Sequence, residues 1–302
     1  MKKLILIFYL LAIAITNNAQ QSDFPKLSGP YMGQAPPSDT PKKFLPDLFR
    51  NIHSSPVFSP DGKQVYWRDM DYKPLQFMEE VNGIWTKPQS VTFTTSFYRQ
   101  DAPFITPDGN KLFFISTKPQ KWYQLRSDEA IWYIEKKGDA WSSPVLASNF
   151  YTHWAFSVSS SGNLFFGGSE DKEHDIWFIY KAEYKNGEYS KPVKLSRSIN
   201  LIEDPVVYGQ VSPFIAPDES FLIFSRKVDS NNLDLFISYQ KEDRSWTEAV
   251  NLGDRINSKG IEICPVVTPD GKYLFYMRRD CVMWVSSKII EDLKPKNKII
   301  IN

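Results

Sequence analysis

The sequence predicts an all-β fold, a five-bladed β-propeller of four-stranded antiparallel blades closed by an N-terminal strand. One tight-turn motif is written five times at intervals of about 50 residues, which is typical of propeller blades. Each repeat also carries the same set of strand-like segments, and one repeat lacks a strand that the N-terminal segment can supply. With 302 residues, 42% of them hydrophobic, the chain can bury a sizeable core.

The repeated motif has the form Ser/Thr-Pro-Asp-Gly and lies between two apolar runs. Proline fixes φ for the first central position of a type I turn, aspartate hydrogen-bonds the local backbone, and glycine takes the left-handed conformation. Each copy is therefore a hairpin turn. The third copy keeps only its glycine and the fourth loses it; the five copies centre on Asp61, Asp108, Ser161, Asp218 and Asp270.

Two further segments follow each hairpin and complete a blade. An aromatic-centred third strand is expected at 75–79, 130–134, 175–179, 234–238 and 282–286. An outer strand, where proline is tolerated because an edge strand need not donate every N–H, is expected at 85–91, 141–147, 189–195 and 246–252. A six-bladed ring is the alternative, but the longest interval, from Ser161 to Asp218, has no room for two blades of about 40 residues.

The fifth blade lacks an outer strand after its third one, and we expect residues 40–46 to supply it. "TPKKFLP" matches "SKPVKLS" so that Pro41 to Phe44 correspond to Pro192 to Leu195. Such closure removes exposed sheet edges. The expected organisation is a signal peptide (1–20), an extension (21–39) and one propeller domain (40–302), with blades at about 54–93, 101–149, 153–199, 210–256, and 261–287 plus 40–46.

The first 20 residues have the layout of a secretory signal peptide. A basic "MKK" precedes an uncharged apolar run, Leu4–Ile15, and a polar exit, "TNNAQ". The run is shorter than the about 20 residues of a membrane span, although an uncleaved anchor is the alternative reading. Cleavage near residue 20 would leave a protein without a transmembrane segment, in the periplasm, outside the cell or at the outer membrane, and we expect it to be monomeric.

Charge and cysteine content exclude some classes of function. Without Lys2 and Lys3 the chain keeps 34 of its 36 basic residues against 35 acidic ones, so no basic surplus points to nucleic acid. Cys264 and Cys281 are expected on the first and third strands of one blade, beyond disulfide distance. Motifs of serine hydrolases, zinc proteases, dithiol sites and phosphate-binding loops are absent from the sequence, and no cofactor or metal is predicted.

The five turns, the "DIWFI" strand (175–179) and the "WSSP" segment (141–144) resemble those of the TolB-like, WD-repeat-like β-propeller proteins of Gram-negative envelopes. The segment "GPYMGQAPPSDTPKKFLPD" (29–47) is similar to that of an exported subgroup known from Bacteroidetes. The resemblance covers nearly the whole chain after residue 20 and implies a propeller that is exported. Propellers of this kind act as docking platforms, as partners of enzyme domains and occasionally as hydrolases, so the resemblance does not decide the activity.

One register of the inner strands offers a candidate binding ring. The five inner strands can be aligned on a shared Pro, which is Phe in the third blade. The residue three positions before this Pro or Phe is polar in every blade, and the residue immediately before the Pro or Phe is small. Small residues suit a crowded axis, and polar residues suit a wet channel mouth above it. This ring could bind a ligand group or a metal, since His and Glu are good metal ligands, or it could simply line a water-filled channel. Gln is a poor metal ligand, which weakens the case for a metal. Its members are His53, Gln100, His153, Gln210 and Glu262.

Loops on the same face add recognition candidates, namely Trp122, Tyr123 and Arg278. Aromatic and charged side chains suit a peptide or a glycan. We therefore expect a non-enzymatic binding or interaction module for a protein, peptide or glycan of the cell envelope. The alternative is a carbohydrate-active hydrolase that uses Asp101 and Glu262, because glycoside hydrolysis needs a pair of carboxylates about 5–10 Å apart.

Overall fold

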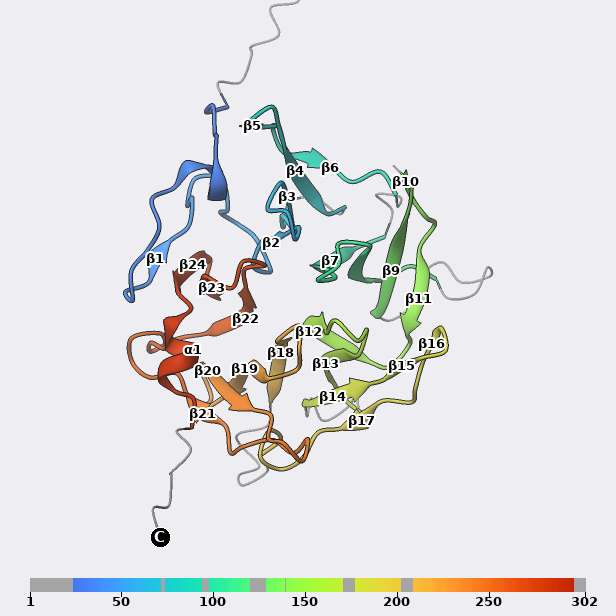
Figure 1. Ribbon diagram of the computed structural model, residues 1–302, viewed down its shortest axis with the longest axis vertical. Coiled ribbons are helices and arrows are strands. Elements are labelled where there is room, and N and C mark those ends of the chain that lie inside the picture. Colours follow the sequence, from blue (N-terminus) through green and yellow to red (C-terminus); the bar gives the residue numbers. More distant parts are fainter. Residues whose placement is uncertain are drawn as a thin grey trace, which may run out of the picture.

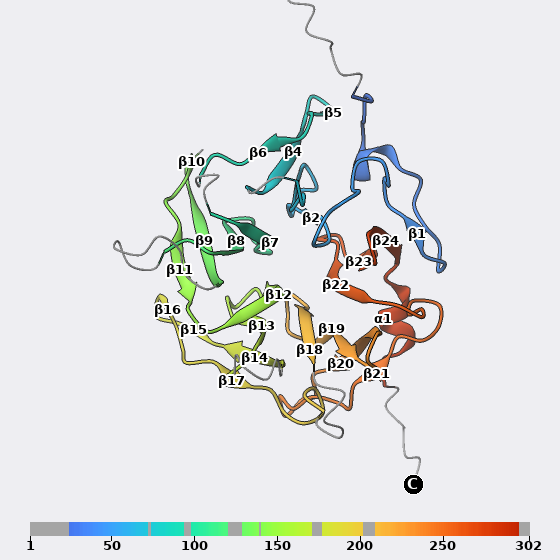
Figure 2. The ribbon, with the colours of Figure 1, turned by 180° about the vertical axis from the view of Figure 1, so that it is seen from behind.

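The computed structural model describes residues 24–71, 74–93, 98–119, 129–138, 140–170, 177–201 and 209–295, with the backbone alone described for His153. Five small antiparallel sheets follow one another around a central axis, and the inner strands β2, β7, β12, β18 and β22 lie nearest that axis (Figures 1 and 2). The prediction of a five-bladed propeller is confirmed. No helix in the described part of the chain is long and apolar enough to cross a membrane.

The first two blades have the predicted strand order, each with a short additional strand at the outer edge. Blade 1 contains β2 (Val57–Phe58), β3 (Gln64–Trp67), β4 (Gln76–Val81), β5 (Ile84–Trp85) and β6 (Gln89–Ser90). Blade 2 contains β7 (Gln100–Ile105), β8 (Lys111–Ser116), β9 (Ala130–Lys137), β10 (Ala140–Trp141) and β11 (Val145–Ser148).

Blades 3 to 5 repeat the same order. Blade 3 contains β12 (Thr152–Val158), β13 (Leu164–Gly168), β14 (Phe178–Ala182) and β17 (Val193–Lys194), beside a hairpin of β15 (Tyr184–Lys185) and β16 (Glu188–Tyr189). Blade 4 contains β18 (Gln210–Ile215), β19 (Phe221–Lys227), β20 (Leu233–Tyr239) and β21 (Val250–Asn251). Blade 5 contains β22 (Glu262–Val267), β23 (Tyr273–Arg278) and β24 (Cys281–Ser286). The helical elements are η1 (Pro30–Gly33) and α1 (Lys288–Asp292).

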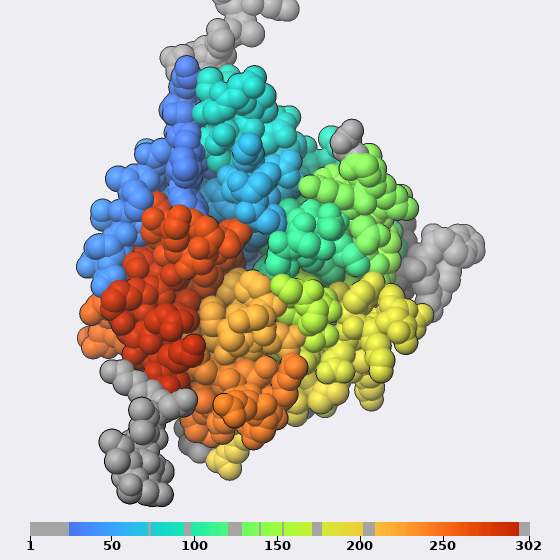
Figure 3. All heavy atoms as spheres, in the orientation of Figure 1, coloured from blue at the N-terminus to red at the C-terminus, as the bar shows by residue number. Residues whose placement is uncertain are grey.

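The outer edge of blade 5 is occupied by β1 (Lys42–Lys43), which pairs antiparallel with β24. The Phe44 N–H donates to the Val282 carbonyl at 2.8 Å, in the same position as the bond from Leu195 N–H to the Ile179 carbonyl in blade 3. The N-terminal and C-terminal parts of the described chain therefore lie side by side, as blue and red surfaces in Figure 3. Whether this pairing holds the ring together stays a prediction.

In three of the turns the aspartate of the motif accepts a hydrogen bond within the turn. The hydroxyls of Ser59, Thr106 and Thr268 donate to the aspartates two residues later at 2.5, 2.6 and 2.7 Å. Blade 3 has no such aspartate, and there Glu219 of blade 4 accepts from Ser159 Oγ and Ser161 Oγ, both at 2.9 Å. The two degenerate turns thus complement each other across a blade boundary.

The small residues of the inner strands lie at β-bulges. Ala102, Ser212 and Cys264 have φ values of 45°, 52° and 53°, and the strand register shifts at each of them. All three are buried, and Ser212 Oγ lies 3.7 Å from Cys264 Sγ across two blades, so the predicted crowding is present. In blade 3 the left-handed residue is instead Trp154, with φ of 71°.

Both cysteines are free thiols on the strands where the sequence placed them. Cys264 lies on β22 and Cys281 begins β24. Burial raises the pKa of the Cys264 thiol to about 12. A thiol with such a pKa is unreactive at neutral pH.

Candidate functional site

The polar ring does not line an open mouth as expected. Gln100 and Glu262 are fully buried and Gln210 is 1% exposed. Gln210 pairs with Arg226 and Glu262 with Arg278 across the first two strands of blades 4 and 5, and Arg278 also contacts the Glu262 carboxylate. The structure therefore differs from the predicted wet ring at these three positions, because each side chain bonds to protein neighbours: Gln100 to the Leu75 N–H, Gln210 to the Leu201 carbonyl and Glu262 to Arg278.

Glu262 is held by a complete set of local partners. Its Oε1 accepts from Ser258 Oγ at 2.6 Å and lies 3.0 Å from Arg278 Nε. Arg278 also donates through NH2 to the Ile256 carbonyl at 2.6 Å and to the Tyr276 hydroxyl at 3.1 Å. Two candidate residues from the sequence, Glu262 and Arg278, are thus brought together as an ion pair.

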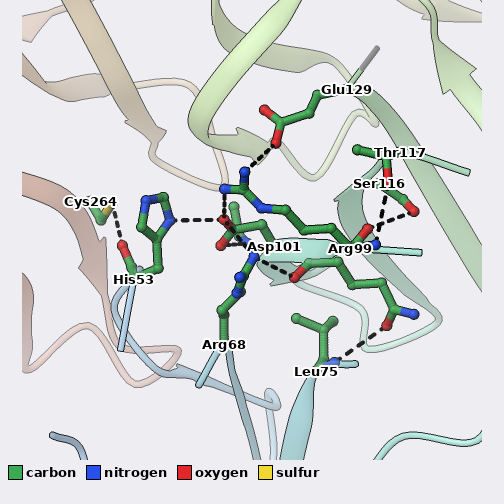
Figure 4. A network of polar contacts seen from close by, with 11 residues as sticks. His53, Arg68, Leu75, Arg99, Asp101, Ser116, Thr117, Glu129 and Cys264 are labelled. Carbon is green, nitrogen blue, oxygen red and sulfur yellow. Dashed lines mark hydrogen bonds and ion pairs between the residues drawn. The ribbon is translucent and has the colours of Figure 1, made fainter. Parts of the chain in front are cut away.

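Asp101 is the centre of a second network, which joins four segments of the chain, at His53, Arg68, Arg99–Asp101 and Glu129 (Figure 4). It is 3% exposed, and its Oδ2 lies 2.8 Å from His53 Nδ1, 3.2 Å from Arg68 NH1 and 2.8 Å from Arg99 NH2. Its Oδ1 accepts the backbone N–H of Ala102 at 2.8 Å, a bond that the adjacent bulge makes available. Arg99 also reaches Glu129 at 3.0 Å.

These contacts fix the charge of the buried carboxylate. Burial alone raises the pKa of Asp101, but the hydrogen bond and charge of His53, then Arg68 and Arg99, lower it below its ordinary value. Asp101 is therefore ionised and neutralised by arginine at neutral pH. A carboxylate in that state is neither a free acid nor an unshielded nucleophile.

Three partly exposed side chains surround this network at one end of the axis. The side chain of His53 is 26% exposed and that of Arg99 is 37% exposed. The indole of Trp154, which is partly buried, stacks on the His53 imidazole with centroids 6.3 Å apart and planes at 19°. The Nδ1 atom of the His53 ring contacts Asp101. We call these three residues the axial mouth.

The remaining sequence candidates lie beyond what the structure describes. Trp122 and Tyr123 fall in the segment 120–128 outside the described residues, and the structure describes only the backbone of His153. Within the described residues no group of three His, Cys, Asp or Glu side chains could hold a metal ion.

Sequence reasoning missed a cavity of about 570 Å³ at the other end of the inner strands. It is lined by the ends of all five inner strands and by the turns that follow four of them; the strand residues include Phe58, Ile105, Val158, Ile215 and Val267. The signal was present in the sequence: the apolar runs "PVF", "PFI", "PFI" and "PVV" that precede the turns converge on the axis. We call this space the turn-face cavity.

Solved structures with a similar fold exist, although no protein-family model and no curated protein matches the sequence. TolB from Acinetobacter baumannii superposes with a TM-score of 0.52 at 14% identity, over 79% of this chain and 55% of that one. A putative TolB from Agrobacterium tumefaciens superposes with a TM-score of 0.50 at 17% identity, over 75% of this chain and 70% of that one. A gluconolactonase from Xanthomonas campestris has a TM-score of 0.46 at 10% identity, over 86% and 99% of the two chains.

At sequence identities this low, the similarity to these structures shows the fold alone. The chain spans little more than half the length of the Acinetobacter protein, so the activity and partners of that protein do not transfer to it. The expected Bacteroidetes subgroup stays a prediction. In fold, this chain is a TolB-like β-propeller.

Proposed function

We propose that this protein is an exported, non-enzymatic binding module that holds a protein, peptide or glycan of the cell envelope at the axial mouth. The observation that carries the proposal is the state of the two candidate catalytic carboxylates. Asp101 and Glu262 are both buried and ion-paired with arginine, while the partly exposed groups beside Asp101 and its partner His53 are an indole, an imidazole and a guanidinium.

This arrangement suits recognition better than bond cleavage. A general acid needs a proton at working pH, and a nucleophile needs access to its substrate. Asp101 has a lowered pKa and three charged or polar neighbours, and Glu262 is covered by Arg278 and Ser258. An aromatic face beside hydrogen-bond donors, in contrast, is a common way to hold a sugar ring or a peptide side chain.

The backbone of Trp154 supports the same conclusion. A non-glycine residue in the left-handed region is costly, and such outliers gather at functional sites. In blades 2, 4 and 5 the small residue before the proline takes this conformation and is buried, whereas Trp154 takes it with its ring partly exposed beside His53. Blade 3 thus departs from the repeat at the axis, where a ligand would lie.

Calorimetry with soluble envelope glycans and short peptides tests the proposal on the chain from residue 21. We expect saturable binding that Trp154→Ala or His53→Ala weakens by about tenfold, since one stacking or hydrogen-bonding contact contributes on the order of 1 kcal/mol. Trp141→Ala is the matched control, because Trp141 is also partly buried but lies on β10 at the outer edge.

Two results would contradict the proposal. Binding that is unaffected by both axial variants in a folded protein would place the ligand elsewhere. Hydrolysis of an envelope glycan by the wild type, abolished in both Asp101→Asn and Glu262→Gln, would establish the carbohydrate-active enzyme instead.

A further inference from the structure

We propose that the turn-face cavity is a second binding site, for a small apolar molecule that carries a cationic group. It lies at the opposite end of the inner strands from the axial mouth, since β7 runs from Gln100 beside the mouth to Ile105 in the cavity wall. The site is therefore independent of the function proposed above.

The walls are apolar and come from every blade. Buried Phe104, Phe214 and Ile215 contribute to the lining, together with Val158 of blade 3 and Phe275 of blade 5. About 570 Å³ falls within the roughly 300–1,000 Å³ of small-molecule sites. Apolar walls hold water poorly, so an apolar occupant displaces it at a gain in free energy.

The repeated turn also forms the entrance to the cavity. The lining includes Pro60, Pro107, Pro217 and Pro269, one from each turn that retains the motif's proline. Pro60, Pro217 and Pro269 are exposed, so the cavity opens to solvent between the turns. The prolines have a fixed φ and a short side chain, and the entrance is therefore preformed.

Charge at the entrance selects the head group of the ligand. The titratable side chains in the lining are Asp218 and Glu291, and both are acidic. Lys294 lies 3.9 Å from Glu291, so these three groups carry a net charge of −1 at neutral pH. An ammonium group attached to an apolar body can place its charge beside them while the body fills the cavity, whereas a carboxylate would be repelled.

Calorimetry with three probes of equal chain length tests this chemistry on the chain from residue 21. Octylamine, octan-1-ol and octanoate share one apolar body and differ in charge. We expect octylamine to bind saturably with one site, octan-1-ol to bind more weakly, and octanoate to bind about tenfold or more weakly than octylamine. Absence of saturable octylamine binding, or equal binding of octanoate, overturns the proposal.

Two sets of variants locate the site. Val267→Phe adds volume at the cavity wall and should weaken octylamine binding about tenfold or more, in a protein that melts no lower than the wild type. Glu291→Gln and Asp218→Asn together should reduce the preference for octylamine over octan-1-ol, while Glu242→Gln, an exposed acid outside the lining, should leave it unchanged.

The Glu291 variant tests the proposal even if Val267→Phe fails to fold. Its side chain is 73% exposed, so Glu291→Gln does not disturb the core. An unchanged preference for the amine in Glu291→Gln with Asp218→Asn overturns the proposal, as does unchanged affinity in a folded Val267→Phe.

Discussion

Removal of the N-terminal strand tests whether β1 closes the ring. Phe44, which follows β1, is fully buried and packs against Phe275 and Trp284 with ring centroids 4.8 and 5.0 Å apart. Phe44→Ala should lower the free energy of unfolding by about 3–5 kcal/mol, the usual cost of truncating a buried phenylalanine. Deletion of residues 21–46 should cost more, because it also removes the strand pairing and buried Met32.

The magnitude translates into a measurable shift in melting temperature. At about 2–4 °C per kcal/mol for a domain of this size, Phe44→Ala should melt roughly 6–20 °C below the wild type. Thermal unfolding followed by far-ultraviolet circular dichroism measures it. Lys43→Ala is the matched control: Lys43 is exposed on the same strand, so its change should stay within about 0.5 kcal/mol.

One outcome would refute the reasoning. If the chain from residue 47 melts at the same temperature as the chain from residue 21, the pairing of β1 with β24 contributes nothing to the integrity of the ring. The fifth blade would then be stable with three strands, and the expected closure would be wrong.

Three further predictions concern buried carboxylates and processing. Asp101→Asn should lower the free energy of unfolding by about 3–5 kcal/mol at neutral pH, because it leaves buried Arg68 without its ion partner. The pKa of Asp101 is lowered in the folded state, so the ionised carboxylate stabilises the fold above about pH 4. The difference in stability between wild type and variant, measured by urea unfolding, should therefore persist above about pH 4 and shrink as the pH falls through the lowered pKa. Glu219→Gln should cost about 2 kcal/mol in the same assay, because Glu219 accepts bonds from Ser159 and Ser161 and lies 3.2 Å from Lys181 Nζ; a loss equal to that of an exposed control, Glu242→Gln, would contradict the cross-blade role. N-terminal sequencing of protein from the envelope should begin near residue 21, and an intact Met1 would exclude signal cleavage.

The fold could be predicted because its determinants are local and repeated. A turn needs particular residues at particular positions, and five copies at a regular interval leave few architectures. The match of Pro41–Phe44 to Pro192–Leu195 also predicted the partner of β24, because outer strands share one pattern of proline and apolar residues. These inferences required no knowledge of which side chains meet in space.

The state of the candidate site could not be predicted in the same way. Register places Gln100, Gln210 and Glu262 at the axial end of the inner strands, but their burial depends on neighbours from other segments, such as Arg278 for Glu262. The network around Asp101 joins side chains that are 48 and 33 residues away in sequence, His53 and Arg68, to Asp101. No local pattern encodes such a meeting, since each arginine alone reads as an ordinary surface residue.

The degenerate turns show what a departure from a repeat can encode. Blade 3 lost the aspartate of its turn, and blade 4 lost its glycine and carries Ala216 where the other turns have Ser or Thr. Each departure alone suggests only a weakened motif. However, Glu219 of blade 4, with φ of 62°, supplies the carboxylate that accepts the hydrogen bond of Ser159 in blade 3, where the turn has no aspartate. Blade 3 departs from the repeat again at Trp154, beside His53. Within a repeat that specifies the fold, the departure at Glu219 is a contact between two blades, and the departure at Trp154 lies where we propose that a ligand binds. For this reason Glu219 and Trp154 are the first side chains to change.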